Sequence, residues 1–257
     1  MGTILYELKN DIAYLTIQSP PANALSSILL QDLDENLDII EQEQKVKAIV
    51  LKGEGKFFSA GADIKEFTSL KNASDYEALS AKGQELFSRI EGFEIPVIAA
   101  IHGAALGGGL ELAMACHIRI AAENAKIGLP ELTLGIIPGF AGTQRLPHYV
   151  GTSKAYEMIL SGEPISGRKA SEFGLVNKAV AEEQLLHETQ ILAEKIAAKS
   201  RPAINRIMAL IPYAKSESFS AGSKAEAKAF GEIFGSEDAR EGVQAFIEKR
   251  KPNFKDK

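Results

Sequence analysis

The chain has few of the features that mark secreted or membrane proteins. Cys116 is the single cysteine among 257 residues. It cannot form an internal disulfide, and its apolar neighbours suggest a small core residue, which favours a reducing compartment. No apolar run reaches membrane length, and the N-terminal segment lacks the basic and apolar regions of a secretory signal. We therefore expect a cytoplasmic protein with no membrane partner.

Metal-ligand patterns and an excess of positive charge are also missing. The four histidines, His102, His117, His148 and His187, show no spacing typical of metal ligands. The net charge is −5, and basic residues gather only in the tail EKRKPNFKDK, so nothing attracts nucleic acid in general. We expect no metal, no redox cofactor and no nucleic-acid partner.

Most of the chain alternates strand and helix patterns. Residues 4–8 and 12–17 alternate apolar and polar around Asn10 and Asp11, which predicts a hairpin. A leucine-rich stripe at helical period predicts a helix from Ser26 to about Glu43, and VKAIVL predicts a buried strand. Next we expect a helix at about 74–90, a strand in PVIAAIH and an apolar helix. Two strand-like segments follow, HIRIAAEN and AKIGLP. This alternation predicts an α/β body with helices on the sheet faces.

The C-terminal third favours helices. After a strand-like segment at 175–180, we expect helices at about 182–199, 202–215, 218–234 and 236–250, with breaks at Arg201, Ser216 and Gly235. We divide the chain into an α/β core at 1–195 and a helical region at 196–257. Large apolar side chains there exceed what a thin appendage can hide, which indicates subunit contacts. They are Phe219, Phe230, Ile233, Phe234, Val243, Phe246 and Ile247.

Two glutamates stand in unusual surroundings. Glu111 lies in the apolar run GGGLELAMAC, and Glu131 follows a proline in IGLPELTLG. Two carboxylates facing one cavity can activate a water and deliver a proton. We expect Glu111 to be half buried, although an exposed helix glutamate is the ordinary alternative. The ordinary alternative for Glu131 is a solvated turn.

Two glycine-bearing loops can bind an anion. FFSAGAD at 57–63 and HGAALGGGLE at 102–111 leave backbone N–H groups open to a ligand, and the second also opens a helix. One amide from each loop would form an oxyanion hole for a thioester carbonyl. The alternative is a tight strand-to-helix turn in which glycine only permits close packing.

Two other enzyme classes fail on their own motifs. Gly103, Gly107 and Gly109 spell GxxxGxG, as in short-chain dehydrogenases, but the pattern lies far from the start of the chain, and no tyrosine has a lysine four residues later. A serine hydrolase does not fit either, because Ser59 lacks the glycine two residues before it that a GxSxG nucleophile elbow needs.

Four segments together resemble the crotonase superfamily, and within it the short-chain enoyl-CoA hydratases. They are GKFFSAGADIKEF, PVIAAIHGAALGGGLELAMACHIRIA, IGLPELTLGIIPGFAGTQRLP and RKASEFGLVNKAV. The resemblance implies a spiral of repeated ββα units with a helical C-terminal trimerisation region. It also implies a homo-hexamer made of two trimers.

The resemblance assigns roles to individual residues. The amides of Ala62 and Gly108 match the oxyanion hole, and Glu111 and Glu131 match the catalytic carboxylates. The coenzyme A contacts that it implies are Ala62, Asp63, Ile64, Lys65 and Gly108, together with Phe246 and Lys249 reaching a neighbouring subunit's ligand. Ala141 stands where the family has the middle glycine of PGxGGTQRL.

We therefore expect a hydro-lyase that adds water reversibly to a trans-2-enoyl-CoA, as in fatty-acid β-oxidation. Coenzyme A would be part of the substrate, so no separate cofactor is implied. An isomerase or another acyl-CoA enzyme on this fold is one alternative, but such members commonly lack a carboxylate at Glu111. A non-catalytic RNA-binding member is the other, and both the acidic balance and the carboxylate pair speak against it. Acyl length remains open.

Overall fold

The computed structural model describes residues 2–67, 72–216, 219–234 and 236–257. Strands in this part of the chain form a six-stranded sheet in the order β1-β2-β3-β4-β6-β9 and a three-stranded sheet in the order β5-β7-β8. The larger sheet contains β1 (Thr3–Lys9), β2 (Ile12–Gln18), β3 (Ala48–Gly53), β4 (Val97–Ile101), β6 (Ile118–Ala122) and β9 (Lys178–Val180). The smaller one contains β5 (Ala104–Leu106), β7 (Lys126–Gly128) and β8 (Ile165–Ser166).

The hairpin at the start of the chain forms as predicted. β1 and β2 pair antiparallel, with Leu8 opposite Ala13. Asn10 and Asp11 have φ values of 52° and 60°, the left-handed pair that a two-residue hairpin turn needs. From β2 to β9, neighbouring strands of the large sheet are parallel, so helices must connect them.

Helices alternate with these strands and then continue alone. Those of the α/β body are α1 (Ser27–Gln42), α2 (Ile64–Phe67), α3 (Ala73–Glu91), α4 (Gly108–Ala115), the 3-10 turn η1 (Glu131–Leu134), α5 (Gly142–Val150), α6 (Thr152–Ser161), α7 (Gly167–Glu172), η2 (Glu182–Gln184) and α8 (Leu185–Ala197). Those that follow are α9 (Arg201–Leu210), α10 (Tyr213–Ser216), α11 (Phe219–Phe234) and α12 (Glu237–Ile247).

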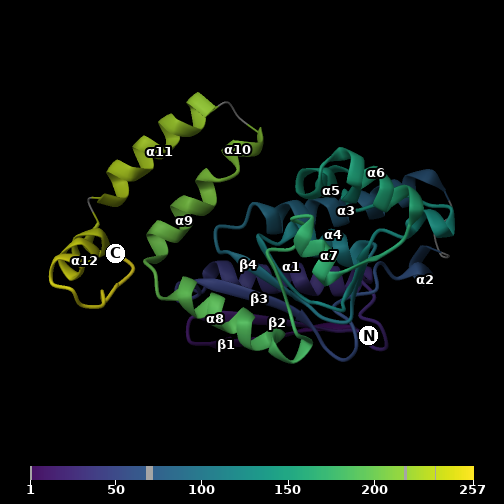
Figure 1. Ribbon diagram of the computed structural model, residues 1–257, viewed down its shortest axis with the longest axis horizontal. Coiled ribbons are helices and arrows are strands. Elements are labelled where there is room, and N and C mark those ends of the chain that lie inside the picture. Colours follow the sequence, from purple (N-terminus) through teal and green to yellow (C-terminus); the bar gives the residue numbers. More distant parts are fainter. Residues whose placement is uncertain (1, 68–71, 217–218, 235) are drawn as a thin grey trace.

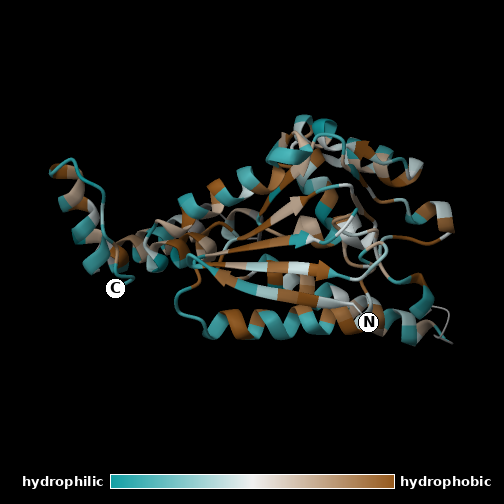
Figure 2. Ribbon diagram, turned by 90° about the horizontal axis from the view of Figure 1, so that it is seen from below, coloured by the Kyte–Doolittle hydropathy of each residue, from teal (hydrophilic) through white to brown (hydrophobic). Residues whose placement is uncertain are grey.

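The core lies on both faces of the large sheet. Every residue of β4 is buried, and so are the first four of β3. Strands buried on both faces need helices on both sides. α8 contacts β3, β4 and β6, and α1 contacts β1; Figure 1 shows α8 in front of the sheet and α1 behind it. Figure 2 shows largely hydrophobic strands beside helices that carry hydrophilic residues on part of their surface.

The alternation of parallel strands and covering helices confirms the predicted α/β class. α1 confirms the predicted helix, and Ser26 caps its N-terminus, because Ser26 Oγ accepts a hydrogen bond of 3.2 Å from the amide of Leu29. Neither α2 nor the two short strands β5 and β8 could be predicted, since each holds only two to four residues. In the described residues, no helix is long and apolar enough to cross a bilayer.

The C-terminal helices form an arm that projects from the body (Figures 1 and 2). The helix predicted at 202–215 is wrong in its length. It ends at Leu210, because Pro212 has no N–H to continue the hydrogen-bond ladder, and α10 begins at Tyr213. Arg201 opens α9 and is not a break. The predicted break at Gly235 lies outside the described residues, as do the side chains of Phe219 and Phe234.

The end of the chain ties this arm to the body. Asp256 Oδ1 lies 2.8 Å from Lys47 Nζ, at the start of β3, and accepts a hydrogen bond of 2.9 Å from the amide of Arg201. On the arm side, buried Asp238 accepts hydrogen bonds from the amides of Lys255 and Asp256. Lys47 is also buried, so this contact supplies its ammonium with a carboxylate partner, and its Nζ also donates to the carbonyl of Lys199 at 3.2 Å.

We predict that Asp256→Ala lowers the free energy of unfolding by about 1 to 2 kcal/mol, because it leaves the buried Lys47 ammonium without its carboxylate. Urea denaturation monitored by circular dichroism measures the change. Lys47→Met combined with Asp256→Ala should recover part of the loss, since the buried ammonium that lost its carboxylate is then absent. Equal stability of Asp256→Ala and the wild type would show that the contact contributes nothing.

Candidate active site

Glu111 lies in the most deeply buried helix of the body. Each residue of α4 from Gly108 to Ala115 is buried, and Glu111 is 1% exposed. The prediction of a half-buried side chain is therefore wrong: strands and helices surround α4 on all sides, and a short apolar sequence could not reveal this. A carboxylate at such a depth needs hydrogen-bond partners within the protein.

Those partners come from the turn that precedes α5. Glu111 Oε1 accepts hydrogen bonds of 2.8 Å from the amide of Phe140 and 2.7 Å from the amide of Gly142. Between them, Ala141 adopts the left-handed region at φ 68°, which directs both N–H groups to one point. This conformation costs a residue with a Cβ about 1 to 2 kcal/mol. Gly142 cannot be replaced freely, because a Cβ there would lie 2.8 Å from Glu111 Oε1.

Burial raises the pKa of Glu111 to about 7. The hydrogen bond from Gly142 lowers the pKa, and the negative charge of Glu131 raises it further. The amide of Phe140 and the guanidinium of Arg145 also lower the pKa. A carboxylate with a pKa near neutrality can exchange a proton with substrate at physiological pH.

Glu131 opens the turn η1 and faces the same space. It is 9% exposed, and a Cβ on Gly107 would lie 3.0 Å from its Oε1 atom. Its Oε2 atom is buried and has no hydrogen-bond partner among the described residues. Burial raises the pKa of Glu131. This burial excludes the alternative that Glu131 lies in a solvated turn. The Oε2 atom can accept a proton from a bound molecule or donate one to it.

The two glycine loops lie side by side. A bridge pairs Ser59 with Ala105, and the amide of Leu106 donates to the carbonyl of Ser59 at 3.1 Å. This pairing brings Ala62 beside Gly108: a Cβ on Gly108 would lie 3.2 Å from the nitrogen of Ala62. Neither amide donates to an acceptor in the described residues. Two free N–H groups beside two carboxylates form a site for a carbonyl oxygen that gains negative charge.

The residues predicted to contact coenzyme A fall into two groups. Asp63, Ile64 and Lys65 continue from Ala62 into α2, with Ile64 and Lys65 exposed beside the site. Phe246, 84% exposed, and Lys249 lie in and just after α12, far from α4 in the same chain (Figure 1). The structure therefore does not bring these two residues to their own active site.

Sequence reasoning missed the turn that holds Glu111. Phe140 and Gly142 act through their backbone, and Arg145 binds that backbone, since its Nη1 atom donates to the Phe140 carbonyl at 2.8 Å. The only signal for them was PGFAGTQRL, where a small residue stands at a position that needs positive φ. Nothing in the sequence could indicate that this turn faces a residue about thirty positions earlier.

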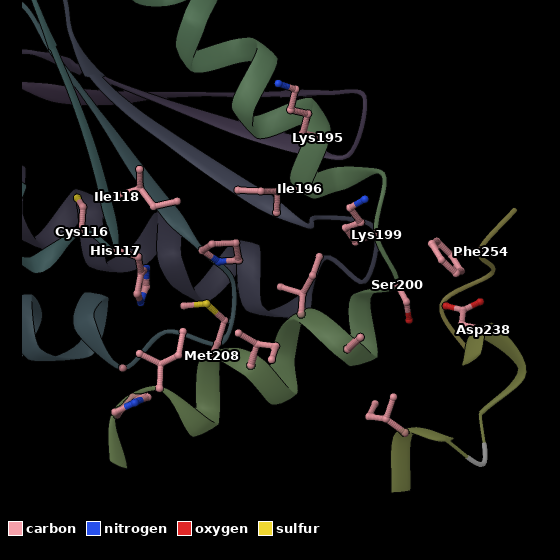
Figure 3. A pocket seen from close by; sticks show the side chains of 18 of the residues that line it. Cys116, His117, Ile118, Lys195, Ile196, Lys199, Ser200, Met208, Asp238 and Phe254 are labelled. Atoms are coloured by element: carbon pink, nitrogen blue, oxygen red, sulfur yellow. The ribbon is translucent and has the colours of Figure 1, made fainter. Parts of the chain in front are cut away.

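A large cavity of the described residues lies elsewhere, between the body and the arm. Its volume is about 1290 Å³. Figure 3 shows Ile196 of α8, Met208 of α9 and Phe254 around it. Since neither Glu111 nor Glu131 lines it, the cavity is not the catalytic pocket.

Comparisons with known proteins assign the family. The family described as Enoyl-CoA hydratase/isomerase matches residues 7–257. A probable enoyl-CoA hydratase of Bacillus subtilis is 58% identical over 99% of both chains, and a crotonyl-CoA hydratase of Syntrophomonas wolfei is 42% identical over 98% of this chain and 97% of its own. The crystal structure of an enoyl-CoA hydratase from Bacillus anthracis superposes with a TM-score of 0.94 at 37% identity, covering 99% of this chain and 100% of that one.

The chain therefore belongs to the enoyl-CoA hydratase/isomerase family, and its fold is that of the crotonase superfamily. Both conclusions confirm the resemblance seen in the sequence motifs.

We predict that Gly108→Val lowers turnover by at least about a hundredfold without unfolding the protein, since its side chain would fill the space beside the Ala62 amide. Activity on crotonyl-CoA and a thermal melt measure the two effects. Gly92→Ala is a suitable control, because a Cβ there makes only ordinary contacts. Normal turnover in Gly108→Val would remove its amide from the site.

Proposed function

We propose that the chain is an enoyl-CoA hydratase that uses Glu111 and Glu131 as its acid–base pair and the amides of Ala62 and Gly108 as its oxyanion hole. One observation carries this proposal: two buried carboxylates with raised pKa values face a pair of backbone N–H groups that have no acceptor within the described residues. Hydrating an enoyl thioester requires these two features together.

The mechanism follows from these positions. The thioester oxygen accepts hydrogen bonds from Ala62 and Gly108, and the N-terminal end of α4 adds partial positive charge there. Ionised Glu111 takes a proton from water while the water oxygen attacks C3. Negative charge then moves onto the thioester oxygen, which gives an enolate. Protonated Glu131 then gives its proton to C2. Water adds across the double bond, and the pair keeps one proton in total.

The proton count explains why both pKa values must be raised. The active form has one ionised and one protonated carboxyl group, and two nearby carboxylates in a poorly solvated site titrate as a coupled pair. Hydration is lost at low pH, when both are protonated, and at high pH, when both are ionised. An isomerase is not favoured, because the water-activating position is occupied by Glu111.

We predict that Glu111→Gln and Glu131→Gln each lower kcat for crotonyl-CoA by at least about a hundredfold with little change in KM, since each removes a proton-transfer group and keeps the shape. In the wild type, the acid limb of kcat/KM should lie above the ordinary carboxyl range, because burial raises the pKa of both Glu111 and Glu131 and the limb reports the coupled pair. Glu123→Gln, at the exposed surface, is the control. Wild-type turnover by either variant at the site would remove that residue from the mechanism.

Several finer properties belong to the same proposal. The reaction needs no metal or redox cofactor, because the acid, the base and the oxyanion donors all come from the chain. The buried free thiol of Cys116 supports a reducing, cytoplasmic location. Similarity to a crotonyl-CoA hydratase supports short enoyl-CoA substrates, as in fatty-acid β-oxidation.

We further propose a homo-hexamer made of two trimers, with contacts through the arm. The arm exposes large apolar side chains that a monomer would leave in water: Ile207, Ile211, Phe230, Val243, Phe246 and Ile247, each 48% to 84% exposed. The cavity between arm and body offers further apolar surface to a second copy (Figure 3). In such an assembly, Phe246 and Lys249 reach a neighbour's coenzyme A.

We predict that light scattering of the wild type gives the mass of six chains. Lys249→Glu should raise KM much more than it lowers kcat, because it places a negative charge near the phosphates of a ligand bound mainly by another subunit. Lys251→Glu has the same charge change two residues along the tail and is the matched control. A monomer with unchanged KM in Lys249→Glu would contradict both the assembly and the role of the tail.

A further inference from the structure

We propose that Arg145 is a positioning residue of this reaction: through the Phe140 carbonyl it fixes the turn whose two N–H groups hold the Glu111 carboxylate. The inference rests on the proposed role of Glu111. It concerns a side chain on α5 that, in this account, touches neither substrate nor the reacting atoms.

The contacts of Arg145 are divided between the turn and α3. Nη1 donates to the carbonyl of Phe140 at 2.8 Å, Nε donates to Glu91 Oε2 at 3.1 Å, and Nη2 lies 3.4 Å from Ser88 Oγ. The planar guanidinium therefore links one peptide group of the turn to the last turn of α3. Because Arg145 is 7% exposed, water cannot easily replace these bonds.

The turn is attached to α3 at a second point. The carbonyl of Gly139 accepts hydrogen bonds from Ser80 Oγ and from Gln84 Nε2. The ring of Phe140 packs edge-on against Phe87, with the ring centroids 5.3 Å apart. These contacts hold the peptide group that carries the Phe140 donor, whereas the contact of Arg145 acts on the Phe140–Ala141 peptide group that lies between the two donors.

A purely structural role is the simplest alternative, since a buried arginine paired with a carboxylate stabilises many folds. The position of the bond argues against it here. The Phe140 carbonyl belongs to the peptide that joins Phe140 to Ala141, and Ala141 is in the left-handed region. This peptide lies between the two peptide groups whose N–H groups bind Glu111. A change in ψ of Phe140 or φ of Ala141 would therefore alter the orientation of one N–H group relative to the other. Such small displacements are costly to catalysis even when the fold survives.

The charge of Arg145 also acts on Glu111. The guanidinium lowers the pKa of Glu111, opposing burial and the charge of Glu131 on η1. On the α3 side, Glu91 faces the guanidinium, and on α6, which packs against α5, Lys154 pairs with Glu157 at the surface. Removing the cation should therefore raise the pKa of Glu111.

The test compares Arg145→Gln, Arg145→Lys and Glu91→Gln with the wild type, using crotonyl-CoA and full pH profiles. Arg145→Gln should lower kcat by about ten- to a hundredfold with little change in KM, and should move the acid limb of kcat/KM to higher pH. Arg145→Lys keeps the charge and loses the planar fork, so kcat falls while the limb stays near its wild-type position. Glu91→Gln removes the ion pair that holds the guanidinium from α3, so kcat should fall with little change in KM.

Arg89→Gln is the matched control, because Arg89 also links α3 to carboxylates, those of Asp34 and Asp38 on α1, but makes no contact with the turn. A lower melting temperature in Arg145→Gln with wild-type kcat and pH profile would overturn the proposal. If Arg145→Gln does not fold, Arg145→Lys and Glu91→Gln decide: wild-type kcat in both variants overturns the proposal. If Glu111→Gln is fully active, the proposed function itself has failed, which is a separate result.

Discussion

The site depends on one interaction, the binding of a single buried carboxylate oxygen by two backbone N–H groups. Glu111 Oε1 accepts from Phe140 and Gly142, and the close approach of Gly142 requires glycine, because a Cβ there would collide with that oxygen. Burial alone would leave Glu111 protonated, and full solvation would leave it a weak base. The two amides and the Arg145 charge act against burial, and the resulting pKa of about 7 suits proton transfer.

The fold provides this interaction by bringing together three loops that are distant in sequence. The loop after β3 supplies Ala62, the turn after β5 supplies Gly108 and Glu111, and the segment after β7 supplies Glu131 and the turn at 140–142. Glycine is required where these loops cross: a Cβ on Gly103 would overlap the carbonyl of Lys56, and one on Gly109 would lie 2.4 Å from the carbonyl of Ser59. Close backbone contact thus places the oxyanion donors beside the acid–base pair.

Much of this could be predicted from sequence where the cause is local. Asn10 and Asp11 mark the hairpin turn, the leucine stripe marks α1, and the motif around Glu111 indicates its family. The rest depends on tertiary contacts. The depth of Glu111 and the partners supplied by Phe140 and Gly142 arise from packing between distant segments. The helix predicted at 202–215 is too long for a local reason, the proline at 212.

The central claim is that the enzyme holds the Glu111 carboxyl group at a pKa near neutrality in its folded, unliganded state. Carbon-13 NMR of protein labelled at glutamate side-chain carboxyl groups measures this directly across a pH series. The account predicts a carboxyl resonance that titrates near pH 7 in the wild type and disappears in Glu111→Gln. Its coupling to Glu131 should broaden the titration. If every glutamate resonance titrates in the ordinary range near 4.3, the account is contradicted.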